Sequence, residues 1–250
     1  MASFLLRAGM VVAALSAQVS VPPHATVPEI TVPFIGCPSD GQVGPREAPS
    51  KSVSMHVGPP QVGQKLAFYE TSDIGVLAPR GWHCFGDYGS GGESIIVTPD
   101  AIDTTKIFSS TPLLLTGGAI SLTHRWGQTS GRYSVADIIA RVFPARMDVV
   151  KRIENFDGMP KSTYTFHPYP SDTLDYKSKT VVEYRTAARS EGLGTRYWLS
   201  GSDTPIDGVA MLKGEAPDLV LLEVRLSPDQ DELTKAIVHE TERDVSRLTR

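Results

Sequence analysis

The sequence lacks several features that would place it in a large class of proteins at once. It has only two cysteines in 250 residues, and no run of basic residues occurs in it. Its formal net charge is −4, and because phosphate backbones are bound by basic patches, we expect no nucleic-acid partner. After the first twenty residues, no apolar stretch reaches the roughly 20 residues that a membrane-spanning helix needs. We therefore expect no transmembrane segment in the mature chain.

The sequence also lacks a complete catalytic or metal-binding motif. Residues 89–92 (Gly-Ser-Gly-Gly) are similar to a nucleophile elbow and to a phosphate loop, but residue 88 is Tyr rather than Gly, and the Gly-Lys-Ser/Thr ending is absent. The six histidines are scattered, without ligand spacing. His167, Asp172 and Asp175 could meet in one loop, although the prolines beside them favour a plain turn. We expect no metal and no cofactor.

The first twenty residues have the pattern of a secretory signal peptide. Arg7 precedes a short apolar run at residues 8–15, and the small residues Ser16, Ala17 and Ser20 follow. The alternative is a buried N-terminal helix, but a proline-rich stretch begins directly afterwards and would end it. The pattern predicts cleavage between residues 16 and 20 and a periplasmic or secreted protein, and the low lysine and asparagine content favours a bacterial source.

Both cysteines, Cys37 and Cys84, lie in the mature part of the chain. An even cysteine count in an exported chain favours a disulfide, which in the chain-entropy account would stabilise a loop of this length by about 4 kcal/mol. The alternative is two unrelated buried thiols. A lipid anchor on Cys37 is disfavoured, because the apolar run that should precede it lies some twenty residues upstream.

The mature chain divides into two parts by composition. Residues 21–62 are rich in proline, glycine and serine and predict an irregular arm. Residues 63–250 predict a single α+β domain, which could form two lobes at 63–132 and 133–250. Apolar runs and alternation predict strands, mostly antiparallel, at 66–69, 75–78, 82–88, 93–98, 113–115, 119–126, 163–167, 180–186, 207–213 and 218–226.

Two regions have helical periodicity. One begins at Ser134, where Ser134 and Asp137 resemble a capping box, and Pro144 should interrupt it before a second turn at residues 146–155. The other is an amphipathic C-terminal helix, with Ser227 as its N-cap, Pro228 at the first helical position and Gln230 completing a capping box.

The densest group of chemically useful side chains lies at residues 80–92. A nucleophilic Cys84 is one hypothesis, but on a strand His83 points to the opposite face, so a base would have to come from His124 or His167. A milder hypothesis is a binding surface, because an aromatic ring beside polar groups can stack on a sugar or anchor a partner. The alternative places these aromatics in the core and the glycines in turns. The candidate surface comprises Trp82, His83, Phe85, Asp87, Tyr88 and Ser90.

Residues 75–86 (GVLAPRGWHCFG), with Tyr88-Gly89-Ser90 and residues 96–99, resemble a block found in uncharacterised exported proteins of Gram-negative bacteria. The segment 36–42 (GCPSDGQ) belongs with it, and the match covers about a quarter of the chain. The resemblance implies a bacterial exported protein in which the two cysteines are paired, and it implies no activity.

The sequence thus favours a non-catalytic binding module for a protein or another component of the cell envelope. The competing hypothesis is an envelope hydrolase acting on peptide, ester or glycan bonds, with residues near His83, Asp87 and Ser90.

Overall fold

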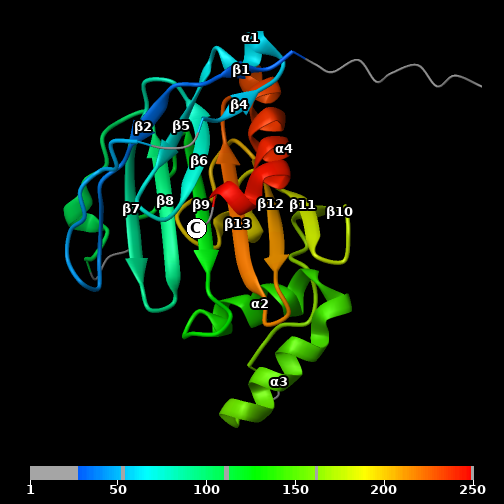
Figure 1. Ribbon diagram of the computed structural model, residues 1–250. Helices are drawn as coiled ribbons and strands as arrows, with labels where there is room; N and C mark the ends of the chain where they lie inside the picture. The colour runs from blue at the N-terminus through cyan, green and yellow to red at the C-terminus, as the bar shows by residue number, and fades with distance from the viewer. Residues whose placement is uncertain (1–27, 52–53, 110–112, 161–162, 249–250) are drawn as a thin grey trace, which may run out of the picture.

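The computed structural model describes residues 28–51, 54–109, 113–160 and 163–248, and its centre is one eight-stranded sheet (Figure 1). All neighbouring strands in this sheet are antiparallel except the β3–β7 pair. The α+β prediction is therefore confirmed. Across the sheet the strands are β10 (Asp172–Tyr176), β11 (Val181–Thr186), β12 (Ile206–Lys213), β13 (Asp218–Arg225), β9 (Ala119–Arg125), β8 (Gly92–Thr98), β7 (His83–Gly89) and β3 (Ser39–Gly41).

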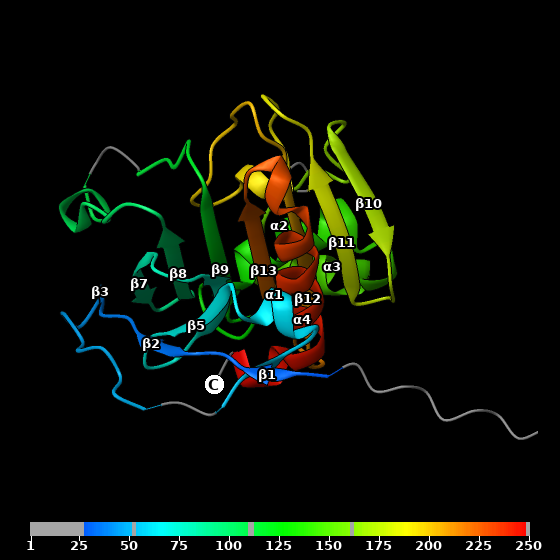
Figure 2. The same ribbon diagram turned by 90° about the horizontal axis from the view of Figure 1, so that it is seen from above.

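Each face of the sheet has its own hydrophobic core, because successive side chains of a strand point to opposite faces. On β13, Leu222 and Val224 belong to one core, whereas Leu219 and Leu221 belong to the other. The first core is closed by α4 (Asp231–Leu248), β5 (Leu66–Glu70) and β6 (Gly75–Pro79). The second is closed by α2 (Arg132–Val142) and α3 (Met147–Asp157). Figure 2 shows α4 lying along the first face.

The described part of the proline-rich arm contains more regular structure than its composition predicts. It supplies β1 (Ile30–Thr31), β2 (Phe34–Gly36), β4 (His56–Val57) and the short helix α1 (Pro60–Gly63). β2 pairs in parallel with β5, and β3 pairs in parallel with β7. The arm therefore joins the small sheet β2-β5-β6 to the edge of the large one.

Two of the predicted strands are wrong. Residues 163–167 form bends and irregular chain and pair with no strand, because the neighbouring prolines Pro168 and Pro170 lack the N–H that a ladder needs. In the 113–115 run only Leu115 pairs, in a single bridge with Leu199. We did not predict β10, whose residues are DTLDY, because aspartate is rare in strands. This segment is extended because it pairs with β11.

The cap predicted at Ser134 is wrong, whereas Ser227 does occupy the N-cap position before the C-terminal helical region, although without the predicted capping box. α2 begins at Arg132, two residues before Ser134, with Gly131 at the N-cap. Before α4, the Ser227 hydroxyl donates to the Gln230 side-chain oxygen at 2.9 Å and accepts no backbone N–H. Pro228 does occupy the first position, in a 3-10 turn (η4, Pro228–Gln230), and Pro144 does interrupt the helical region.

The two suggested lobes share one sheet, because β9 pairs with β13 over seven residues. The segment predicted to be a signal peptide, residues 1–20, lies outside the described residues. Within the described ranges, no helix has both the length and the apolar character needed to cross a bilayer.

Candidate functional site

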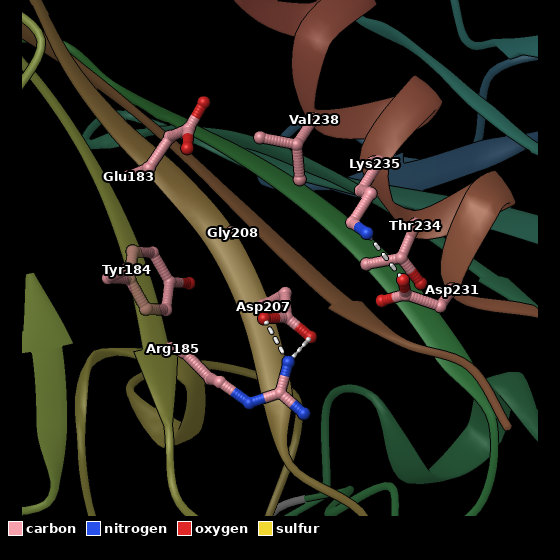
Figure 3. A pocket seen from close by; sticks show the side chains of 9 residues that line it. All are labelled: Glu183, Tyr184, Arg185, Asp207, Gly208, Asp231, Thr234, Lys235 and Val238. Carbon is pink, nitrogen blue, oxygen red and sulfur yellow. Dashed lines mark hydrogen bonds and ion pairs between the residues drawn. The ribbon is translucent and has the colours of Figure 1, made fainter. Parts of the chain in front are cut away.

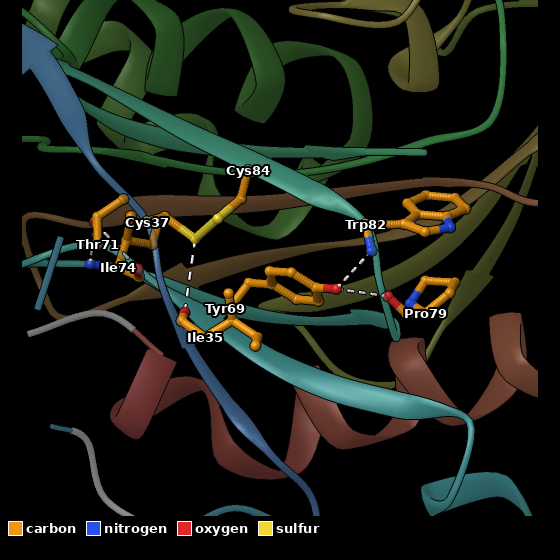
Figure 4. Close-up of a disulfide and its surroundings, with 8 residues drawn as sticks. All are labelled: Ile35, Cys37, Tyr69, Thr71, Ile74, Pro79, Trp82 and Cys84. Carbon is orange, nitrogen blue, oxygen red and sulfur yellow. Dashed lines mark hydrogen bonds between the residues drawn. A yellow bond between two sulfur atoms is a disulfide. The ribbon is translucent and has the colours of Figure 1, made fainter. Parts of the chain in front are cut away.

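A disulfide joins the arm to the large sheet (Figure 4). Cys37 follows β2, Cys84 lies on β7, and their Cα atoms are 5.5 Å apart. Beside it the Tyr69 hydroxyl donates to Pro79 O at 2.7 Å and accepts the Trp82 N–H at 3.0 Å. The expected disulfide is confirmed, and the hypothesis of a nucleophilic Cys84 is wrong because its sulfur carries no thiol.

The residues of the candidate surface do not form one surface. Trp82 packs against the first core, and Tyr88 lies on the same face of β7 as Cys84, with its hydroxyl donating to Gly44 O. Phe85 and Asp87 lie on the opposite face of β7. Ser90 is exposed in the turn before β8, where its Oγ lies 3.1 Å from Ser130 Oγ.

The spacing along β7 separates the residues suggested for hydrolysis. His83 begins the strand and Ser90 follows its last residue. Seven residues of extended chain span about 23 Å, whereas a nucleophile and its base must be within hydrogen-bond distance. His83 and Ser90 therefore cannot act as a catalytic pair in this fold.

A cleft forms where the arm pairs along the edge of β7, and we call it the arm cleft. Its volume is about 430 Å³. Phe85 contributes from β7, and Phe108 contributes from the loop after β8, with 56% of its surface exposed. The remaining lining residues come from the arm and the same loop: Pro38, Ser39, Asp40, Pro45, Arg46, Glu47, Thr104 and Thr105.

The arm wall of this cleft is held in place by Arg46. Its guanidinium lies 3.6 Å from the centre of the Tyr88 ring, and one of its nitrogens lies 2.5 Å from Asp73 Oδ2. Gly41 approaches so closely that a Cβ there would lie 2.0 Å from Tyr88 O. Only glycine permits this contact, so β3 can pair with β7 and present Asp40 to the cleft.

The opposite wall is a loop with its own local order. Asp103 caps a 3-10 turn (η1, Thr104–Lys106) by accepting the Thr105 N–H at 3.2 Å. The Thr105 hydroxyl also donates to Asp103, and this bond holds the pKa of Asp103 below its usual value. The turn brings Thr104 and Phe108 to the cleft. An aromatic pair with hydroxyl and carboxylate groups beside it therefore surrounds one hollow.

A second groove lies between α4 and the strands β11 and β12 (Figure 3). Its volume is about 270 Å³. Arg185 donates to both oxygens of Asp207, at 2.8 and 3.0 Å, and Lys235 lies 2.7 Å from Asp231. Burial raises the pKa of Asp207, and Arg185 opposes that shift. A charged ligand would have to break one of these ion pairs, so this groove is less suited to binding than the arm cleft.

The second face also carries a buried acid, Glu223, which has no exposed surface. Burial raises its pKa to about 8, while the backbone N–H groups of Tyr197 and Trp198, the Ser121 hydroxyl and Arg125 oppose the shift. On β7, burial likewise raises the pKa of Asp87, and Arg125 and Ser94 oppose it. Glu223 is enclosed in the fold, so we assign it a structural role, whereas Asp87 is half-buried.

His124 is enclosed by carboxylates. Its Nδ1 lies 3.2 Å from Glu93 Oε1, its Nε2 lies 3.6 Å from Asp218 Oδ2, and only 5% of its surface is exposed. His167, in contrast, is exposed, and its Nδ1 lies 3.0 Å from Pro168 O. Across the part of the chain that the structure describes, no group of three or more His, Cys, Asp or Glu side chains could hold a metal ion.

Sequence reasoning found Phe85 and missed the rest of the arm cleft. Arg46 and Glu47 lie about 60 residues before Phe108. No periodic pattern marks them, since they belong to the arm and a loop. Comparison of the chain with models of protein families, with curated proteins and with solved structures finds no match in any of the three.

Proposed function

We propose that the chain is an exported, non-catalytic binding module whose arm cleft recognises a carbohydrate of the bacterial cell envelope. The observation that carries this proposal is the pair Phe85 and Phe108 lining one cleft, with Phe108 more than half exposed. An exposed aromatic ring in a concave site can stack on the apolar face of a sugar ring.

The polar groups of the cleft support a carbohydrate over an apolar ligand. Asp40 and Glu47 can accept hydrogen bonds from sugar hydroxyls, and Thr104 and Thr105 can both donate and accept. The arm is fastened by the disulfide, which fits an oxidising compartment outside the cytoplasm. The residues of the competing hydrolase hypothesis are separated along β7, so the geometry favours binding.

Binding to purified peptidoglycan sacculi and to soluble N-acetylglucosamine oligomers tests this proposal. The mature protein should bind saturably, and Phe108→Ala should weaken binding by about tenfold because stacking is lost. Because the Phe108 side chain is exposed, the Phe108→Ala variant should have the same thermal stability as the wild-type protein. Tyr176→Ala is the matched control, because Tyr176 is 51% exposed on β10 at the other edge of the sheet.

Two outcomes would contradict the proposal. One is that the wild-type protein binds none of these carbohydrates. The other is that Tyr176→Ala weakens binding as much as Phe108→Ala does.

A further inference from the structure

A third cavity lies between α2, α3 and two turns at the end of the sheet opposite to α1. Its volume is about 460 Å³, within the range of small-molecule sites. The turns after β9 and between β12 and β13 close it with Gly127, Gln128, Ala216 and Pro217. Figure 1 shows α3 projecting away from the sheet.

The inner wall of the cavity is apolar. Val135 and Val149 are buried beneath it, Ile153 is half-buried, and Phe156 at the rim is 84% exposed. An exposed phenylalanine ring is in contact with water, and an apolar ligand that covers it gains about 25 cal/mol for each Å² of apolar surface removed from water.

The charges at its mouth favour an anion. Arg132 is neutralised by Asp157, to which it donates two hydrogen bonds at 3.1 and 2.9 Å. Arg152 lies 3.2 Å from Asp148, but both side chains are more than half exposed, so this pair is weak. Of the charged residues that line the cavity, Arg132 and Arg152 are basic and Asp157 is acidic, and the weak ion pair leaves Arg152 able to exchange Asp148 for the carboxylate of a ligand.

We propose that this cavity binds a single-chain amphipathic carboxylate, a medium-chain fatty acid, with the alkyl chain against Ile153 and Phe156 and the carboxylate at Arg152. The inference is independent of the carbohydrate proposal, because the two cavities share no residue. Two other occupants are possible outcomes of the test: a second copy of the chain, or any apolar compound regardless of its charge. Each would give a result different from that expected for a fatty acid.

Titration calorimetry of the full mature protein tests the inference with decanoate, 1-decanol and decyltrimethylammonium, each below its micelle concentration. Decanoate should bind about tenfold more tightly than decyltrimethylammonium. Arg152→Gln should weaken decanoate binding about fivefold and leave decanol binding unchanged. Ile153→Asn should weaken binding of all three compounds. Lys151→Gln, on the exposed side of the same helix, is the control and should change nothing.

Thermal melting of each variant establishes that it is folded. If Ile153→Asn does not fold, Phe156→Ala, at an exposed position, replaces it as the test of the apolar wall. Equal binding of the anionic and cationic compounds, or no binding of decanoate, would overturn the inference. Concentration-dependent dimerisation that Phe156→Ala abolishes would assign the cavity to a second copy and would also overturn it.

Discussion

At the residue scale, two ionisable side chains buried on β13 affect this fold in different ways. Glu223 and Arg225 are both almost fully buried and lie on the same face, two residues apart. Arg225 donates to Gly117 O at 2.7 Å, to Ser200 O at 2.5 Å and to Leu115 O, so it ties two loops to the sheet. Glu223 instead stays largely protonated near neutral pH. Neither role could be predicted from the sequence, because both depend on partners far along the chain.

The raised pKa of Glu223 predicts a pH-dependent stability. In the unfolded chain this carboxyl loses its proton near pH 4.5, whereas in the folded protein it keeps the proton until about pH 8. Between these two pH values the folded state binds more protons than the unfolded state. The contribution of Glu223 to the free energy of unfolding therefore falls as pH rises, by on the order of 4 kcal/mol in total. Urea unfolding from pH 4.5 to 9 measures this, and Glu223→Gln should flatten the profile and be the more stable protein at pH 9. A variant with the slope of the wild type would contradict the assignment.

Replacing Arg225 should destabilise the protein strongly. Arg225→Met removes the guanidinium donor of Gly117 O and Ser200 O inside the fold, whereas Leu115 O keeps the Ser200 N–H, and the expected cost is about 3–5 kcal/mol in the free energy of unfolding. Arg185→Met is the control, since Arg185 is 52% exposed and its loss should cost less than about 1 kcal/mol. Similar losses for the two variants in denaturant titrations would show that Arg225 does not anchor the loops.

At the element scale, the sequence predicts strands with a strong hydrophobic pattern and fails where pairing alone makes a strand. β8 and β13 are buried along nearly their whole length and were predicted within one residue. β10 is polar and was missed, and the short arm strands are extended because β5 and β7 supply their hydrogen bonds. The alternative that placed the glycines of residues 80–92 in turns was more informative: Gly92 has φ +140°, and a Cβ there would lie 2.1 Å from His124 O.

The disulfide predicts how firmly the arm is held. It closes a separation of 47 residues, so the Cys37→Ser/Cys84→Ser variant should lose about 4 kcal/mol of unfolding free energy in the chain-entropy account. Hydrogen exchange should increase first in β2 and β3, because they contribute only three residues each to their sheets. Unchanged exchange in these strands would mean that backbone pairing alone fixes the arm.

At the scale of the whole molecule, the described structure is built on one eight-stranded sheet, and the arm returns to the edge of that sheet. The fold class follows from the alternation of apolar residues, which is a local property of the sequence. The arm cleft does not follow from it, because Arg46, Phe85 and Phe108 meet only after the arm has paired with β7. The suggestion of a binding surface near Phe85 was therefore the most that residues 80–92 could provide.

The most direct test of the arm cleft as a carbohydrate site is a two-dimensional NMR titration of the mature protein with soluble N-acetylglucosamine oligomers. The account predicts saturable shift changes concentrated at Asp40, Arg46, Phe85 and Thr104–Lys106, with little change along α4. Changes centred on the groove between α4 and β12, or no change at saturating oligomer, would contradict it.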